Sequence, residues 1–211
     1  MKIISLKEVG STHEYLKNYI KKEGYTELIC CVTKYQTDGI GSRGNSWSGR
    51  KGNLFFSFAI KKEELPKDLP LQSASIYFSY LLKKQLEKLG SKVWLKWPND
   101  FYINELKVGG TITTATGNLL LCGIGLNLLE VSEEFGFLDI SIDENELLND
   151  YLINIKKELS WQDVLNEYVI EFKRSEKFHV TVNNHKVSLK DAQLNDDGSI
   201  QINGEKVFSL R

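Results

Sequence analysis

The sequence predicts an α+β fold in which a mixed or antiparallel sheet is flanked by helices and followed by a small β-rich unit. Short apolar runs at hairpin spacing between residues 92 and 126 indicate antiparallel strands. Segments with helical periodicity stand before and after these runs. From about Glu176 the pattern changes to an alternation of apolar and polar residues, which is typical of half-buried strands.

The first part of the chain is expected to place strands and helices around a long loop. A short strand at 2–6 leads into Ser11 and Thr12, whose hydroxyls can cap a helix. A β-type run at 28–33 precedes a polar, glycine-rich loop from Gln36 to Gly52. The remaining elements are expected at 53–60 (strand), 71–89 (helix, ended by Gly90), and 92–97, 101–103, 107–114 and 118–126 (strands).

The second part is expected to contain two helices, at 144–159 and 161–174, with Ser160 as a capping residue between them. Turns for four or five short strands are supplied by Asn183-Asn184, Asp197-Gly198 and Asn203-Gly204. A unit of this size predicts a small β-barrel that packs on the main domain, because it is too small for dependable stability alone. We therefore expect two domains, residues 1–175 and residues 176–211.

Composition narrows the class of protein. The chain has 211 residues, of which 41% are hydrophobic and 26% charged, as in globular proteins. Its 27 basic and 28 acidic side chains leave a net charge of −1, without the basic excess of a general nucleic-acid binder. No run approaches the roughly 18 apolar residues of a membrane span, and no secretory signal is present, so a cytoplasmic protein is expected. The three cysteines, Cys30, Cys31 and Cys122, lie in apolar runs, which favours buried reduced thiols, and without zinc-type spacing no structural metal is expected.

The loop from Gln36 to Gly52 has a composition that suits an anion. Its glycines are Gly39, Gly41, Gly44, Gly49 and Gly52. Glycines at alternate positions let backbone N–H groups point into one concavity, while Arg43 and Arg50 add charged donors and Trp47 adds an apolar wall. A plain surface loop is the alternative, because neither a dinucleotide fingerprint nor a phosphate-loop motif is present.

The segment from Lys96 to Gly110 places polar side chains at a strand end. Pro98 ends the preceding strand, so Asn99 and Asp100 stand where the chain turns. Asn99 could read a purine edge, and Asp100 could accept a proton or help to hold Mg²⁺. The hairpin return brings Lys107, suited to a pair of anions, and then two glycines that allow a ligand close to the backbone. An ordinary β-turn is the alternative.

Taken together, five segments in this order resemble the biotin–protein ligase family. Ser11-Thr12 resembles its Ser-Thr-Asn motif, and Tyr35-Gln36 with Gly39, Gly41, Arg43, Gly44 and Trp47 resembles its ligand loop. Lys96-Trp97-Pro98-Asn99-Asp100 is its KWPND motif, Lys107 to Gly110 resembles its Lys-x-x-Gly strand, and Gly123-Ile124-Gly125-Leu126-Asn127 resembles its GxGxN strand. The resemblance implies a class II synthetase-like catalytic domain and a C-terminal SH3-like barrel, and it overrides both plain-loop alternatives.

The resemblance also implies an activity. Biotin would react with ATP, assisted by Mg²⁺, to biotinyl-5′-AMP, and the biotinyl group would pass to a lysine of a biotin carboxyl carrier domain of a carboxylase. It implies catalytic roles for Lys107, Asp100 and Arg43. It implies biotin contacts for Ser11, Thr12, Gln36, Gly39, Gly41, Lys107, Gly110 and Gly123. It implies ATP or adenylate contacts for Arg43, Gly44, Trp47, Asn99, Lys107 and Asn127, and no metal-ligating set.

Three positions depart from the family pattern. Ile40 and Ser42 stand where the family loop has arginines, so we expect weaker retention of the adenylate, and His13 stands where asparagine is usual. The motifs begin at Ser11, so a short form without a DNA-binding domain is expected, with no DNA partner and as a monomer or homodimer. A lipoate–protein ligase and a non-catalytic biotin sensor are the alternative functions.

Overall fold

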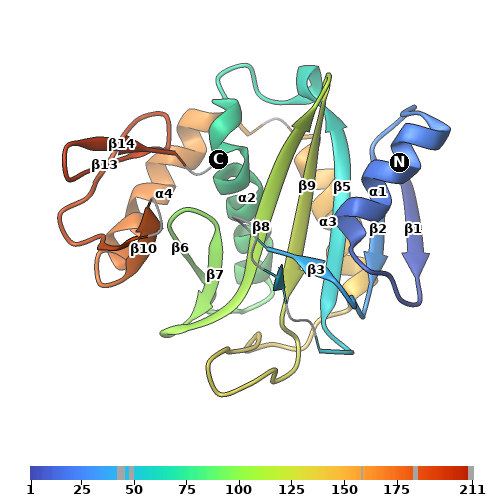
Figure 1. Cartoon of the computed structure of the whole chain (residues 1–211), viewed down its shortest axis with the longest axis horizontal. Helices are drawn as coiled ribbons and strands as arrows, with labels where there is room; N and C mark the ends of the chain where they lie inside the picture. Colours follow the sequence, from blue (N-terminus) through green and yellow to red (C-terminus); the bar gives the residue numbers. More distant parts are fainter. Residues whose placement is uncertain (42–45, 48–49, 158, 183–184, 209–211) are drawn as a thin grey trace.

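The computed structural model describes residues 1–41, 46–47, 50–157, 159–182 and 185–208. Its centre is a seven-stranded sheet with the strand order β1-β2-β5-β9-β8-β7-β6 (Figure 1). Only β1 and β2 of this sheet run parallel, and the other pairs are antiparallel, so the predicted mixed sheet is confirmed. The strands are β1 (Lys2–Leu6), β2 (Ile29–Thr33), β5 (Leu54–Lys61), β6 (Trp94–Lys96), β7 (Asp100–Ile103), β8 (Leu106–Thr116) and β9 (Leu119–Leu126).

Helices cover both faces of this sheet. One face carries α1 (Thr12–Glu23), and the other packs against α2 (Ala74–Lys88), beside which lie α3 (Glu144–Ile155) and α4 (Trp161–Ser175) (Figure 1). The predicted caps are present, because Ser11 accepts a hydrogen bond from the Glu14 amide and Ser160 accepts one from the Asp163 amide.

Two predicted helix boundaries are wrong in detail, and one predicted loop contains two short strands. The helix expected from residue 71 begins as a 3₁₀ turn, Leu71–Ser73, and becomes α-helical only at Ala74. The helix expected to reach residue 159 ends at Ile155. The loop after Gln36 contains a short hairpin, β3 (Gly39–Ile40) paired with β4 (Ser46–Trp47). A further 3₁₀ turn, Lys62–Glu64, follows β5.

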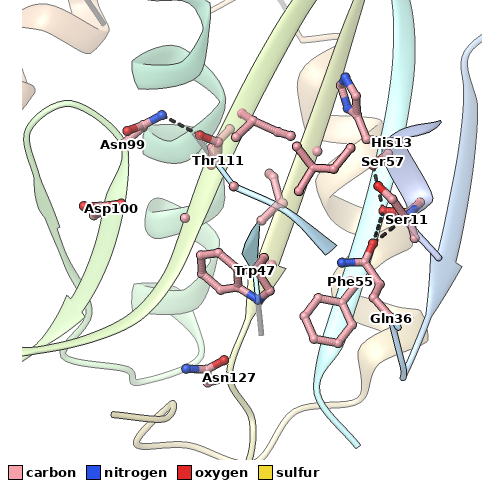
Figure 2. A pocket seen from close by; sticks show the side chains of 18 of the residues that line it. Ser11, His13, Gln36, Trp47, Phe55, Ser57, Asn99, Asp100, Thr111 and Asn127 are labelled. Carbon is pink, nitrogen blue, oxygen red and sulfur yellow. Dashed lines mark hydrogen bonds between the residues drawn. The ribbon is translucent and has the colours of Figure 1, made fainter. Parts of the chain in front are cut away.

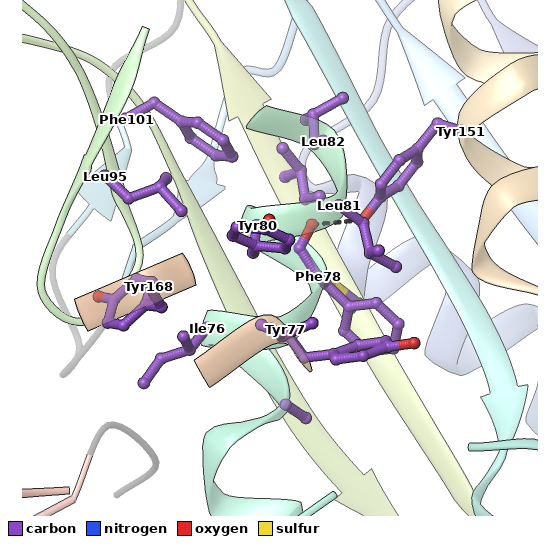
Figure 3. Packing of buried hydrophobic residues seen from close by; sticks show 14 of the residues in the cluster. Ile76, Tyr77, Phe78, Tyr80, Leu81, Leu82, Leu95, Phe101, Tyr151 and Tyr168 are labelled. Carbon is purple, nitrogen blue, oxygen red and sulfur yellow. Dashed lines mark hydrogen bonds between the residues drawn. The ribbon is translucent and has the colours of Figure 1, made fainter. Parts of the chain in front are cut away.

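Most of the core lies between the sheet and helices α2, α3 and α4. Figure 3 shows aromatic and aliphatic side chains of these elements packed around α2, among them Phe78, Tyr151 and Tyr168. Phe58 of β5 meets Phe78 edge to face, with ring centroids 4.9 Å apart. The three cysteines are buried and free, as predicted, and burial raises the pKa of the Cys31 thiol to about 12.

The C-terminal residues form two small antiparallel sheets, which confirms the predicted β-rich tail. Their strands are β10 (His179–Val182) with β11 (His185–Ser188), and β12 (Gln193–Leu194), β13 (Ile200–Ile202) and β14 (Glu205–Val207). The expected turns at Gly198 and Gly204 have positive φ, whereas Asn183-Asn184 lies outside the described residues. Val180 and Ile200 join the same apolar cluster as the main sheet, so the tail packs on it closely.

No helix among the described residues is long and apolar enough to cross a membrane.

Candidate active site

A cavity of about 410 Å³ opens on the sheet face that carries α1, beyond the N-terminal end of that helix. Its floor is formed by β5, β8 and β9, and its rim includes the β3–β4 hairpin and the segment after β9. The predicted site residues that line it are Ser11, Thr12, Gln36, Gly41, Trp47, Asn99, Asp100, Lys107, Gly110, Gly123 and Asn127. Arg43, Gly44 and Ser42 lie outside the described residues. The structure therefore brings together residues that are spread over more than half of the sequence.

Gly39 lies beside the cavity rather than in its lining. A Cβ atom at this position would lie 2.5 Å from the Trp47 carbonyl oxygen and 2.9 Å from Nε2 of Gln36. Such distances are impossible for a real side chain, so the hairpin needs glycine here to bring β3 against β4. Gly39 thus acts on the shape of the loop and the placement of Gln36.

One end of the cavity holds an uncharged cluster of buried polar groups. Both the backbone amide and the hydroxyl of Thr12 donate hydrogen bonds to Oε1 of Gln36, at 2.7 and 3.0 Å. The Thr12 hydroxyl also lies 2.9 Å from the hydroxyl of Ser57 (Figure 2). These groups offer donors and acceptors without net charge, which suits a neutral polar ligand that must be desolvated.

His13 adds a neutral imidazole to this end. Its side chain is only 5% exposed, and burial lowers its pKa below the usual 6.5, against a smaller opposing effect of Glu14. Nε2 lies 3.1 Å from the hydroxyl of Thr114. Nδ1 has no hydrogen-bond partner among the described residues and lies close to Gly123. The residue that replaces the family's asparagine is thus part of the cavity wall.

The burial of His13 predicts acid sensitivity. Because its pKa is lower folded than unfolded, the unfolded chain binds the extra proton first, and stability falls as pH drops below about 6.5. We expect His13→Asn to remove this loss, which has a limiting slope of about 1.4 kcal/mol per pH unit. The free energy of unfolding of the wild type and of His13→Asn, measured with urea at pH 7.5 and 5.5, tests this prediction. Carboxylates with lowered pKa, such as Asp139, act only at lower pH, and equal losses in both proteins would contradict the prediction.

The opposite end of the cavity is charged. Nζ of Lys107 lies 2.6 Å from Oδ1 of Asp100, and Nζ of Lys96 lies 3.7 Å from Oδ2 of the same carboxylate. Asn99 donates a hydrogen bond through Nδ2 to the Thr111 carbonyl, and the Thr111 amide donates to the Asn99 carbonyl at 3.1 Å. The peptide bond between Trp97 and Pro98 is cis. The turn of residues 97–100 carries Asn99 and Asp100 to one side of the cavity (Figure 2).

Trp47 lies between the two ends (Figure 2), against the glycines Gly110 of β8 and Gly125 of β9. A Cβ atom at Gly125 would come within 3.1 to 3.2 Å of three atoms of the indole ring, so the glycine lets the ring approach the sheet. The Lys107 ammonium lies 5.3 Å from the centre of this ring, within cation–π range. Trp47 therefore connects the hairpin to the charged end.

A pair of asparagines anchors the segment after β9. Oδ1 of Asn53 accepts the amides of Leu128 and Leu129 at 2.9 and 3.0 Å, and its Nδ2 lies 3.5 Å from Oδ1 of Asn127. Asn127 in turn donates to the Gly136 carbonyl at 3.0 Å. Asn127 thus borders the cavity with its amide held in a fixed orientation.

Several lining residues escaped the sequence analysis, namely Phe55, Ser57, Thr111, Ile112, Val131 and Phe135. Ser57 carried a usable signal, because it is the lone hydroxyl in the apolar run of its strand. Val131 and Phe135 belong to the segment after β9, which has no helical or strand periodicity, so the local sequence gives no sign that they line a site. Ile40, one of the departures from the family pattern, lines the cavity and is 39% exposed.

Comparisons with known proteins agree with this geometry. The profile of the Biotin/lipoate A/B protein ligase family matches residues 6–128. A crystal structure of the biotin acetyl coenzyme A carboxylase synthetase of Helicobacter pylori, with bound biotinylated ATP, has a TM-score of 0.92 and 39% identity, covering 98% of this chain and 99% of that one.

Sequence comparison finds relatives of greater length. Biotin–protein ligase 2 of Arabidopsis thaliana is 36% identical over 129 residues, and the bifunctional ligase/repressor BirA of Escherichia coli K12 is 31% identical over 127 residues. Each match covers 57% of this chain and 38% of the relative, so the matched part is about two fifths of these curated proteins. The family profile covers more than half of the present chain, which therefore belongs to the biotin/lipoate A/B protein ligase family.

Proposed function

We propose that this protein is a biotin–protein ligase, which activates biotin with ATP to biotinyl-5′-AMP and transfers the biotinyl group to a lysine of a carboxylase's biotin carboxyl carrier domain. The observation that carries the proposal is the polarity of one cavity. Its neutral end, with Thr12, Gln36 and Ser57, suits a ureido group, and its charged end, with Lys107, suits a carboxylate beside a phosphate. The likeness to the Helicobacter pylori synthetase, whose structure contains biotinylated ATP, supports it.

In the first half-reaction a carboxylate oxygen of biotin bonds to the α-phosphorus of ATP, and the bond from that phosphorus to the β-phosphate oxygen breaks. Two anions must meet, so the ammonium of Lys107 would neutralise the charge that grows between them. Arg43 and the amides near Gly41 would assist, and Trp47 would help to exclude water. Asn99 and Asn127 would contact the adenylate, and Gly110 and Gly123 would leave room for biotin.

Magnesium would enter this step with ATP. Mg²⁺ keeps several waters and is commonly held by substrate phosphates with one or two carboxylates, not by a cage of protein ligands. The described residues contain no cluster of three metal-ligating side chains, and Asp100 is a carboxylate at the charged end of the cavity. Asp100 and the nucleotide phosphates would therefore hold the ion, which would withdraw charge from the leaving pyrophosphate.

In the second half-reaction the amine of the acceptor lysine attacks the acyl carbon of the mixed anhydride. An amide bond forms, AMP leaves, and the attacking nitrogen loses a proton. Asp100 is our candidate to accept that proton, because it lies on the cavity wall at the charged end. Its contacts with Lys107 and Lys96 hold the carboxylate in place.

The name of the family includes lipoate ligases, and the neutral cluster supports biotin as the substrate. The ring of lipoate is apolar, so the buried groups of Thr12, Gln36 and Ser57 would lose hydrogen bonds if it lay against them. Biotin can satisfy them. We further propose a cytoplasmic location, in keeping with the buried free thiols, a monomer or homodimer as the active form, and no DNA partner.

The test is a mass measurement on the acceptor. A purified biotin carboxyl carrier domain is incubated with the protein, biotin, ATP and Mg²⁺, and should gain the mass of one biotinyl group at a single lysine. Lipoate replaces biotin in a parallel reaction, and an acceptor with that lysine changed to arginine serves as control. A gain with lipoate alone would identify a lipoate ligase. Biotin binding without pyrophosphate release or mass gain would identify a sensor.

A further inference from the structure

Helix α4 contacts the strand that leads into the candidate catalytic turn. Strand β6 is the edge strand of the seven-stranded sheet, and it runs directly into the turn of residues 97–100, which carries Asn99 and Asp100. In an antiparallel edge strand every second residue turns its N–H group away from the sheet. Leu95 in β6 and Trp97 just after it occupy such outward positions, because their amides donate to side chains of α4.

Both outward amides are bound by side chains of α4. The Leu95 amide donates to Oε2 of Glu171 at 2.9 Å, and the Trp97 amide donates to the hydroxyl of Ser175 at 2.9 Å. One turn earlier on the helix, the hydroxyl of Tyr168 donates to the Pro98 carbonyl at 2.9 Å. Residues 168, 171 and 175 are spaced three and four apart, so they share one face of the helix.

These contacts are buried and otherwise satisfied. Tyr168 and Ser175 are fully buried and Glu171 is 4% exposed. Oε1 of Glu171 pairs with Lys83 of α2 at 2.9 Å, and the hydroxyl of Ser175 donates to the Glu171 carbonyl at 3.3 Å. A buried, fully satisfied polar network has one favoured geometry, because each group that moves loses a partner in a low-dielectric surrounding. The α4 face therefore fixes the path of the backbone from Leu95 to Pro98.

We propose that Tyr168, Glu171 and Ser175 are positioning residues, through which α4 sets the geometry of the 97–100 turn for the reaction. This inference rests on the proposed function. The three residues do not touch the cavity; they act through Asn99 and Asp100, which line it. The family profile matches residues 6–128, and α4 follows this matched part in the sequence. An error of about 1 Å in the placement of a reacting group can lower a rate by as much as 10²-fold, so control of this turn has a direct kinetic consequence.

The chain offers a matched control for Tyr168. The hydroxyl of Tyr151, also fully buried, donates to the Phe78 carbonyl at 3.0 Å (Figure 3). Tyr168→Phe and Tyr151→Phe each remove one buried hydroxyl and leave one backbone carbonyl without that donor, so comparable losses of thermal stability are expected. Only Tyr168 contacts the 97–100 turn, so a difference between the variants reports on positioning.

Two readouts are compared in the two variants. The first is steady-state pyrophosphate release with biotin, ATP and Mg²⁺, in which Tyr168→Phe should lower kcat about tenfold and leave KM for biotin within about twofold. Tyr151→Phe should change neither by more than about twofold. The second is amide hydrogen exchange of the ligand-free protein. The Thr111 amide, bound to the Asn99 carbonyl, should exchange faster in Tyr168→Phe than in the wild type, but not in Tyr151→Phe.

The outcomes separate the inference from the proposed function. Equal kcat and equal exchange in the two variants would overturn the inference. A wild-type protein that releases no pyrophosphate would overturn the proposed function, and the exchange measurement would still decide whether α4 orders the turn. If Tyr168→Phe does not fold, Ser175→Ala, which removes the acceptor of the Trp97 amide, takes its place and must show the same lowered kcat and faster exchange.

Discussion

Replacement of Lys107 by methionine is expected to lower biotin-dependent pyrophosphate release by about 10²–10³-fold, the usual cost of removing one preorganised charge or donor from a transition state. Methionine keeps an unbranched side chain of similar length, so the change removes charge with little loss of volume. Lys107 lies between Asp100, 2.6 Å away, and the ring of Trp47, at the end of the cavity where we place the two reacting anions. Without the ammonium their repulsion would be uncompensated.

The measurement is the initial rate of pyrophosphate release at saturating ATP and biotin. Lys61→Met is the matched control, because Lys61 lies on the same sheet and pairs at 3.1 Å with Glu63, an exposed contact of small energetic value. The control should keep the wild-type rate. If Lys107→Met kept more than about a third of the wild-type rate, Lys107 would not be stabilising the transition state.

Replacement of Asp100 by asparagine is expected to act on the second half-reaction. Transfer from preformed biotinyl-5′-AMP to the carrier domain should slow by about 10²-fold or more near neutral pH, because general-base assistance contributes about 10²–10⁴-fold. The rate should recover as pH rises, since a larger fraction of the acceptor lysine is then neutral without help from a base. Asparagine has nearly the shape of aspartate, so the turn is preserved.

Single-turnover transfer between pH 6.5 and 9.5 provides the measurement. Asp197→Asn is the control, because Asp197 also pairs with a lysine, Lys206, at 2.7 Å, but in the C-terminal sheets away from the cavity. Its pH profile should follow that of the wild type. A profile for Asp100→Asn that runs parallel to the wild type, lowered or not, would show that Asp100 does not accept the proton.

Much of the site could be predicted because its residues belong to contiguous motifs. Lys96 to Asp100 form one such motif. The pairing of β7 with β8 places Asp100 opposite Gly110, on the same strand as Lys107. The uncharged cluster was only half predicted, since Ser57 meets Thr12 across 45 residues and stands in a run that reads as ordinary core. Distant partners of this kind leave no local pattern.

The remaining misses share that cause. The β3–β4 hairpin has two residues in each strand, too few for a periodic signal, and depends on the close approach at Gly39. Asn53 was read as the start of a strand, yet its side chain holds the backbone at Leu128, 75 residues away. The role of Glu171 on α4 has no signal in the sequence, because only the fold places it against Leu95.

The cover that α4 provides over β6 also bears on how the protein behaves at high concentration. An open sheet edge is a template on which another chain can add a strand, and this is a common route to aggregation. With the Leu95 and Trp97 amides already occupied by Glu171 and Ser175, this edge offers no such template over those residues. Substitutions that loosen α4 would therefore expose a surface for intermolecular strand pairing, and yield and solubility would suffer before the fold itself was lost.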